Sequence, residues 1–425
     1  MNRKHLPFIV IAAMMVMSIS VGCGKDDPEP TPTPTPTPVD TDTIVTPVDT
    51  DTVVIPVDST VFIKWNGASA SIEVDEKLAD LFTTEINGGH VVLTNPNVTD
   101  EFLFVLSGTC EDGSFTYNGA FKTSFQFDGL QLTSTQGGAI DIQCGKRIKL
   151  DLKDGTTNTL ADAAEGEQKA AFNCQGHLEV SGSGSLSVAG NARHAFRTKE
   201  YLELKETTGA ITIATAAADA IHCGEFFQMN GGTLTISGMG GDGIQVETDP
   251  GSEELLNGQF IMNGGSIDLT MTTQDTKGIR LDIDTLNQFV PEMKILDGTI
   301  TVNLTSTALG AKAIVSDGNL TIGSSTTEPK INVTVAAGVF TEKIDGVEEE
   351  NRATGIKAEQ TLLIAGGATT VTASGKKSRG VRAATLRATG GSLTVKNTGS
   401  KSQGIKLDNT YSSEGGTVSG TFKYN

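Results

Sequence analysis

Short runs of alternating apolar and polar residues fill most of the chain beyond residue 60. One unit reads Phe227-Gln-Met229, then Asn230-Gly-Gly232, then Leu234-Thr-Ile236, and residues 260–269 repeat this order. Alternation with a period of two predicts strands that bury one face. The glycine pairs between the runs supply the positive backbone angles that tight turns need. The pattern therefore predicts many short strands joined by glycine corners.

A four-residue motif also recurs: a small residue, an apolar residue, any residue, and an apolar or small residue. Its copies begin at Ala171, Ala195, Ala220, Gly243, Gly278, Ala313, Gly355, Gly380 and Gly404. Most successive copies lie 23 to 25 residues apart, and the steps of 35 to 42 residues contain insertions near residues 248–259, 282–292 and 336–351. A fixed period of this length indicates a solenoid whose units bury their side chains against their neighbours.

We therefore predict an all-β fold: a right-handed parallel β-helix, which is a single-stranded solenoid with three short strands per coil and about ten coils. It would occupy residues 61–425. Residues 61–118 are a candidate N-terminal cap and residues 417–424 a candidate final strand, because open strand edges invite pairing with other chains. The alternative is an antiparallel β-sandwich, whose hairpins fit the near-constant spacing less well.

Residues 1–22 have the pattern of a signal peptide. Basic residues precede an apolar run from Phe8 to Val21 that is too short to span a bilayer as a mature helix. The run ends at Ser20-Val-Gly-Cys23, which resembles the lipobox of bacterial lipoproteins. We therefore expect Cys23 to carry the lipid anchor; the alternative is an ordinary cleaved signal peptide.

The next residues predict a stalk at the cell surface. The run Cys23-Gly-Lys-Asp-Asp27 resembles the surface-export signal of Gram-negative glycan-degrading bacteria, although a charged linker can begin this way by chance. Residues 23–60 form a tether rich in Pro, Thr and Asp, which favours extended polyproline II structure and cannot bury a core. The expected location is the outer membrane, facing the cell exterior.

The charge balance excludes some partners. The net charge is −19; residues 1–22 contribute +2 and the tether −7, so the body carries −14. This excess of acid argues against nucleic acid, and leaves the lipid as the expected contact with a membrane. We expect the body to be a monomer.

The body resembles the carbohydrate-binding family of parallel β-helix proteins related in fold to pectate lyases. The resemblance rests on the order and number of the coil motifs, and on Leu106-Ser-Gly108, Leu130-Gln-Leu132, Ala139-Ile-Asp-Ile142 and residues 154–160. It implies extracellular binding of plant-type polysaccharide, pectic or cellulosic, with bound calcium. The chain has few of the family's doubled Asp-Asp-Gly motifs, which puts the number of calcium sites in doubt.

Stacking the motifs turns sequence positions into columns on the surface. The position before each motif holds Asp219 and Asp242 on adjacent coils. Two carboxylates about one strand spacing apart repel unless a proton or cation joins them, and calcium binds through such oxygens. We therefore predict a calcium site at Asp219 and Asp242; the alternative is two solvated loop acids.

The third position of the motif forms another column. Together with the basic residues of the column just described, it makes a basic ladder. Its predicted polysaccharide-binding residues are Arg197, His222, Lys277, Arg280, Lys312, Lys357, Arg379, Arg382 and Lys406. Arginine matches carboxylates in a bidentate way and lysine adds point charges, so the ladder favours acidic glycans such as polygalacturonate. Neutral glucans would need aromatic platforms, which this ladder lacks. The alternative is that these side chains only keep a flat sheet soluble.

Catalysis is less well supported than binding. A calcium-dependent pectate lyase needs a base for the C5 proton, and Arg280 or Arg197 can be placed in that role. We find none of the signature segments of the lyases, and no carboxylate pair can be assigned to glycosidase chemistry. A binding protein is therefore favoured, with a polysaccharide lyase or a structural, adhesin-like surface protein as the alternatives.

Overall fold

The computed structural model describes residues 59–282, 291–344 and 346–424. Within these ranges the fold is all-β, and the short helix α1 (Glu76–Ala79) is the one α-helix. The strands build one long, mostly parallel sheet of 36 strands, together with a separate hairpin. Within the described residues, no helix is both long and apolar enough to cross a membrane. The expectations about Cys23 and the tether fall outside the described residues.

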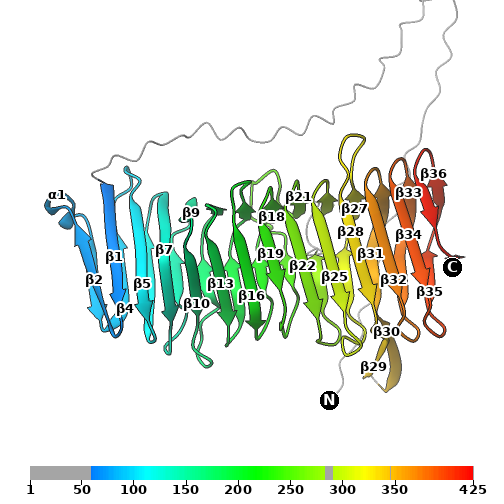
Figure 1. Ribbon diagram of the computed structural model, residues 1–425, viewed down its shortest axis with the longest axis horizontal. Helices are drawn as coiled ribbons and strands as arrows, with labels where there is room; N and C mark the ends of the chain where they lie inside the picture. The colour runs from blue at the N-terminus through cyan, green and yellow to red at the C-terminus, as the bar shows by residue number, and fades with distance from the viewer. Residues whose placement is uncertain (1–58, 283–290, 345, 425) are drawn as a thin grey trace, which may run out of the picture. The chain divides into compact units, whose positions relative to one another are not determined.

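The long sheet consists of three stacks, because each coil contributes one strand to each stack in turn. Strands three apart along most of the chain pair in parallel, for example β11 with β14 and β14 with β17. Figure 1 shows the coils following one another in chain order, from β1 and β2 in blue to β36 in red. This is the solenoid-like arrangement that the repeat predicts.

The first stack holds the four-residue motifs. Its strands are β4 (Gly89–Asn95), β6 (Gly113–Gly119), β8 (Ile140–Gln143), β11 (Ala170–Cys174), β14 (His194–Thr198), β17 (Ile221–Cys223), β20 (Ile244–Val246), β23 (Lys277–Leu281), β26 (Lys312–Ser316), the first halves of β31 (Thr354–Ile364) and β33 (Arg379–Ala388), β35 (Gln403–Leu407) and β38 (Phe422–Tyr424).

The second stack follows each motif after a corner. It comprises the first parts of β1 (Thr60–Asn66), β5 (Leu103–Cys110) and β7 (Thr123–Thr133), then β9 (Ile148–Leu152), β12 (Leu178–Ser181), β15 (Leu202–Leu204), β18 (Phe226–Met229), β21 (Gln259–Met262), β24 (Glu292–Ile295), β27 (Asn319–Ile322), the second halves of β31 and β33, and β36 (Tyr411–Ser413).

The third stack closes each coil. It comprises the ends of β1, β5 and β7, then β10 (Thr157–Ala161), β13 (Ser185–Gly190), β16 (Ala210–Ala216), β19 (Thr233–Ile236), β22 (Ser266–Met271), β25 (Thr299–Leu304), β28 (Lys330–Val335), β32 (Ala368–Ala373), β34 (Ser392–Asn397) and β37 (Thr417–Ser419).

The core lies inside the coils and consists of apolar columns. Phe172 and Phe196 occupy matching positions on adjacent coils, and their buried rings stack with centroids 4.5 Å apart. Cys174 and Cys223 each pair in register with the intervening Thr198, so the two thiols lie two coils apart and are free and buried, as predicted. Burial of such columns against both neighbours is what stabilises a solenoid.

The predicted glycine corners take positive backbone angles. Gly232 and Gly265, which end two matching Asn-Gly-Gly corners, both have φ of 83°. A Cβ atom on Gly265 would come within 2.7 Å of the carbonyl oxygen of Gly232. These positions therefore need glycine for the turn and for the close stacking of successive corners.

The first coils and one insertion depart from parallel pairing. Within residues 61–118, β2 (Ser69–Val74) pairs antiparallel with β1 and β3 (Thr83–Asn87) pairs antiparallel with β4, while β1 and β4 also join the parallel stacks. The insertion near residues 336–351 is the hairpin of β29 (Val339–Ile344) and β30 (Val347–Arg352), which projects from the coils in Figure 1. Of the insertion at 282–292, residues 283–290 lie outside the described ranges.

Candidate functional site

The residues of the basic ladder lie in register on the first stack, as predicted. Arg197 pairs with His222, and each later coil adds one outward residue at the same height of the motif. From Arg197 onward the column is Arg197, His222, Gln245, Arg280, Val315, Lys357, Arg382, Lys406 and Lys423, and Asn173 and Asp141 continue it on the two preceding coils. The neighbouring column contains Lys277, Lys312, Thr354, Arg379 and Gln403 in register.

The two predicted calcium ligands lie on adjacent coils, and each carboxylate holds the coil that follows. Oδ1 of Asp219 accepts a hydrogen bond of 2.8 Å from the backbone N–H of Asp242. Oδ1 of Asp242 accepts one of 2.7 Å from the backbone N–H of Lys277. A guanidinium nitrogen of Arg280 lies 3.6 Å from Oδ2 of Asp242. The two acids therefore have separate polar partners, and calcium at this pair remains a prediction.

Two histidines flank the remaining oxygen of Asp219. Nδ1 of His222 lies 3.0 Å and Nδ1 of His194 lies 3.3 Å from Oδ2 of Asp219. Burial opposes ionisation of this carboxyl, but its contacts with both imidazoles and the hydrogen bond from the Asp242 N–H hold its pKa well below its usual range. Burial lowers the pKa of His222, but hydrogen bonds to Asp219 and Glu247 outweigh this effect and raise it to about 9.

Sequence reasoning missed this His–Asp–His cluster. His194 precedes the motif at Ala195, in the column that holds Asp219 and Asp242, whereas His222 belongs to the ladder. The signal was available, because Asp219 comes three residues before His222 and one coil after His194. Residues of two neighbouring columns meet across the coil spacing.

Acidic side chains neutralise much of the ladder in its middle coils. An acidic column lies two residues after the ladder column along the chain. It holds Glu247, Asp282, Asp317, Glu359 and Asp408. Arg280 forms a 2.8 Å ion pair with Asp282, and Lys357 pairs with Glu359. Residues two apart on a strand share a face, so this arrangement could have been read from the sequence. The uniform basic stripe that the sequence suggested is therefore a mixed stripe over these coils.

Positive charge is in excess on the last coils. We call Arg352, Arg379, Arg382, Lys406 and Lys423 the C-terminal basic cluster. Burial lowers the pKa of Arg379 to about 10, and the charges of Arg382 and Arg352 add to this effect while Asp408 opposes it. Burial, Arg379 and Arg382 together lower the pKa of Lys406. These cations repel one another, although Arg382 forms a 3.2 Å ion pair with Asp408 and Arg352 a 3.4 Å ion pair with Glu350.

The candidate lyase bases are both held by polar neighbours. Arg280 contacts the carboxylates of Asp242 and Asp282. Arg197 donates from Nη1 to Oδ1 of Asn173 at 3.1 Å, and burial lowers the pKa of Arg197. Two carboxylates thus occupy the guanidinium group of Arg280, so this geometry does not favour it as a base.

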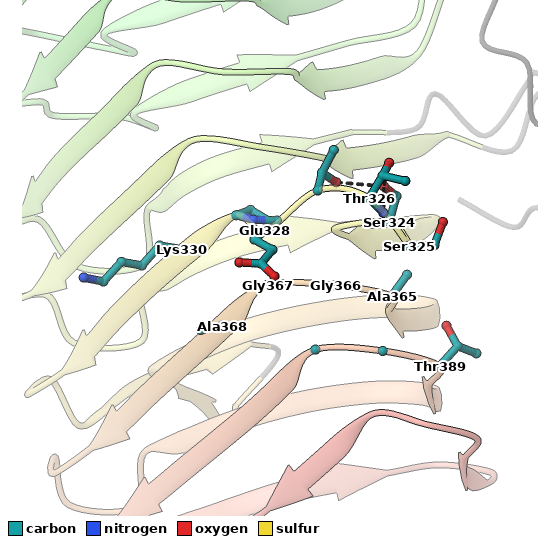
Figure 2. Close-up of a pocket in the computed structure, with 14 residues that line it drawn as sticks. Ser324, Ser325, Thr326, Glu328, Lys330, Ala365, Gly366, Gly367, Ala368 and Thr389 are labelled. Atoms are coloured by element: carbon teal, nitrogen blue, oxygen red, sulfur yellow. Dashed lines mark hydrogen bonds between the residues drawn. The ribbon is translucent and has the colours of Figure 1, made fainter.

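A groove runs over the corners between the second and third stacks. It has a volume of about 850 Å³ and is lined by residues 324–330, 365–368 and 389–391. Figure 2 shows the hydroxyl-bearing loop around Ser324 beside the corner of Gly366 and Gly367. Its hydroxyl groups bond mainly to one another, for example Ser324 with Thr327 at 2.9 Å. The groove lies away from the ladder, and none of the predicted site residues lines it.

Together these features define an all-β, solenoid-like protein with charged columns on one face. The family model described as "Carbohydrate-binding domain-containing protein" matches residues 87–404, so the chain belongs to this family. A relative from Acetivibrio thermocellus with the same description is 26% identical over 138 residues, which are 30% of this chain and 48% of the relative. The chain thus spans about half the length of that relative.

A solved structure also aligns with the chain. It is titled as the polysaccharide lyase-like protein from C. thermocellum, gadolinium derivative. The alignment has a TM-score of 0.43 and 20% sequence identity, and it covers 64% of this chain and 96% of that chain.

Proposed function

We propose that this protein binds acidic, plant-type polysaccharide, such as pectin or polygalacturonate, along the charged columns of its first stack. Membership of the carbohydrate-binding family supports a glycan ligand. The C-terminal basic cluster is the observation that carries the choice of an acidic glycan. After burial, the charges of its neighbours lower the pKa of Arg379 and of Lys406, so a bound carboxylate would relieve the repulsion at these two side chains.

The geometry of the cluster suits a chain of regularly spaced carboxylates. Arg379, Arg382 and Lys406 lie on two adjacent coils, about 4.8 Å apart along the solenoid. Nε of Arg379 donates to Oε1 of Gln403 at 3.0 Å, which orients the guanidinium group. Arginine binds carboxylates through two parallel hydrogen bonds. Arg379 and Arg382 would therefore set the register of the glycan, and Lys406 would add charge.

Calcium assistance and the details of the coil belong to the same proposal. Calcium at Asp219 and Asp242 would use the Oδ2 atoms, since both Oδ1 atoms accept backbone hydrogen bonds. We further propose that the coil is a right-handed parallel β-helix, because parallel strand crossovers are nearly always right-handed. The body would act as a monomer.

A surface location completes the proposal. Lipidation at Cys23 and a tether over residues 23–60 would hold the body outside the outer membrane. A Cys23→Ser variant should then leave the membrane fraction. The wild-type chain should stay bound to the membrane and should be cleaved by protease added to whole cells. Retention of the Cys23→Ser variant in the membrane would contradict the anchor.

Gel retardation in the presence of polygalacturonate tests the binding. We expect the full chain to be slowed by polygalacturonate, and the Arg382→Gln variant to be slowed much less. Arg387→Gln is the matched control, because Arg387 lies on the same strand β33 but in the second stack. Equal retardation of both variants, or none by any acidic glycan, would contradict the proposal. Release of unsaturated, ultraviolet-absorbing products would instead support the lyase alternative.

A further inference from the structure

We propose that His194, Asp219 and His222 bind a divalent first-row transition metal ion of the zinc type. One ligand atom from each residue lies within 4.8 Å of the other two. The residues come from two successive coils. His194 lies on β14, Asp219 lies just before β17, and His222 lies within β17. The fold therefore assembles the cluster from segments 25 residues apart in the chain.

The separations of the ligand atoms fit such an ion. Zinc binds histidine nitrogen at about 2.0–2.1 Å and carboxylate oxygen at about 2.0–2.2 Å, so tetrahedral ligands lie roughly 3.3 Å from one another. Oδ2 of Asp219 lies 3.0 Å from Nδ1 of His222 and 3.3 Å from Nδ1 of His194. These two separations are close to those of tetrahedral ligands around one ion.

This site shares Oδ2 of Asp219 with the predicted calcium site, so the two ions would exclude each other there, and the chemistry of the donors distinguishes them. Calcium takes six to eight oxygen ligands, whereas imidazole nitrogen suits zinc, copper, nickel and iron. Two of the three donors here are imidazoles. The carboxylate of Asp242 is turned to the backbone of Lys277 and to Arg280, and so lies outside this donor set.

Neighbouring polar groups orient two of the donors, Asp219 and His222. The backbone N–H of Asp242 holds Oδ1 of Asp219, which leaves Oδ2 for the ion. Nε2 of His222 lies 3.6 Å from Oε2 of Glu247, and Oε1 of Glu247 accepts a hydrogen bond of 2.8 Å from Gln245. An ion would displace the proton that Nδ1 shares with Asp219, while the proton on Nε2 stays directed at Glu247, which is the usual second-shell arrangement of metal-bound histidine.

His194 already has a lone pair on Nδ1, which an ion would take over from the hydrogen bond that this nitrogen accepts. Its Nδ1 accepts a hydrogen bond of 3.3 Å from the backbone N–H of Asp219. The rings of His194 and His222 lie side by side, with centroids 4.6 Å apart. The side chain of His194 is 9% exposed and that of His222 is 17% exposed, so the donors are sheltered but reachable from the ladder face.

Three protein ligands leave a coordination position open, as at catalytic and ligand-binding metal sites. The open position would face the ladder, where a glycan carboxylate could complete the coordination. This last step rests on the proposed function, whereas metal binding itself does not. A bound divalent ion would also add positive charge beside Arg280, whose own charge is paired with Asp242 and Asp282.

Metal titration of the full chain tests the site. Untagged protein should be stripped with a chelator and titrated by calorimetry with zinc and, separately, with calcium. Cobalt(II) should serve as a second probe, because its visible absorption reports nitrogen and oxygen ligation. We expect one zinc ion to bind per chain, with release of protons, and cobalt to give a visible spectrum that zinc abolishes.

Substitutions locate the ion. His194→Gln, His222→Gln and Asp219→Asn should each weaken zinc binding at least about 100-fold, and Glu247→Gln roughly 10- to 100-fold, which is the usual second-shell effect. Asp219→Asn keeps an acceptor for the Asp242 N–H, so the fold should survive. His90→Gln is the control, since His90 also lies beside a carboxylate, 3.3 Å from Asp112.

The contradicting results are specific. Absence of zinc and cobalt binding, or binding that the three ligand variants leave unchanged, would overturn the site. Calcium binding that survives His222→Gln, without zinc binding, would overturn it in favour of the predicted calcium site. Polygalacturonate retardation is measured on the same variants without metal, so failure of glycan binding is seen separately.

Discussion

Oδ1 of Asp219 accepts a hydrogen bond of 2.8 Å from the backbone N–H of Asp242, one coil further along. Asp242 repeats the contact with Lys277 at 2.7 Å. These side chains join successive coils at a corner. Both acids are largely buried, so each serves the structure independently of any bound cation.

Removing the second of these acids should destabilise the protein with or without metal. Asp242→Ala leaves the N–H of Lys277 without its acceptor, and we expect a loss of about 1–3 kcal/mol in the free energy of unfolding. Asp242→Asn keeps an acceptor and should cost less. Urea unfolding in chelator and in calcium measures both. If Asp242→Ala destabilises the protein only when calcium is present, the carboxylate acts solely as a calcium ligand and the coil-joining role is wrong.

The pH dependence of stability should show that a protonated His177 stabilises the fold. Burial lowers the pKa of His177, but the carboxylates of Glu200, Glu225 and Glu254 outweigh this and raise it. A raised pKa stabilises the fold below the unfolded pKa of about 6.5, and this stabilisation is lost as the pH rises through the folded pKa.

We therefore expect His177→Gln to lower the melting temperature more at pH 6 than at pH 9. The glutamine keeps a polar group but loses the charge and the ring that stacks on Tyr201 with centroids 4.3 Å apart. The ring contact contributes at both pH values, so only the difference between them reports the charge. An equal loss at pH 6 and pH 9 would show that the carboxylates do not stabilise a protonated His177.

Two glycines with the same backbone angle should tolerate alanine differently. Gly155 and Gly367 both have φ of 70°. A Cβ on Gly155 meets nothing within 4 Å, whereas on Gly367 it would lie 2.2 Å from the carbonyl oxygen of Pro329. Gly155→Ala should cost about 1 kcal/mol from backbone strain, and Gly367→Ala about 1–3 kcal/mol more from the clash. Urea unfolding measures both variants. An equal loss of unfolding free energy in the two would mean that the coils at Gly367 move apart without energetic cost.

The sequence predicted the coil well because its signal is repeated. The copies of the motif at Ala195, Ala220 and Gly243 set the register that the structure shows for Arg197, His222 and Gln245. Glycine corners such as Gly232 were equally readable, since few other residues accept that angle. The antiparallel pairs β1–β2 and β29–β30 were not predicted, because each occurs once and follows no period.

The candidate site was predicted less completely. The columns were right, but their partners depend on contacts between columns. Asp282 lies beside Arg280, and His194 beside Asp219, through side-chain geometry that the period alone does not give. The excess of positive charge at the C-terminal basic cluster appears only after these pairs have been counted.

The affinity for polygalacturonate compared with its fully methyl-esterified form tests the central claim most directly. The two polymers share a backbone and differ in charge, so recognition of carboxylates by Arg379, Arg382 and Lys406 requires a large preference for the free acid. We predict at least about 10-fold tighter binding of polygalacturonate at moderate ionic strength, with the preference falling as salt is added. Equal affinity for both polymers, or tighter binding of the ester, would contradict the account.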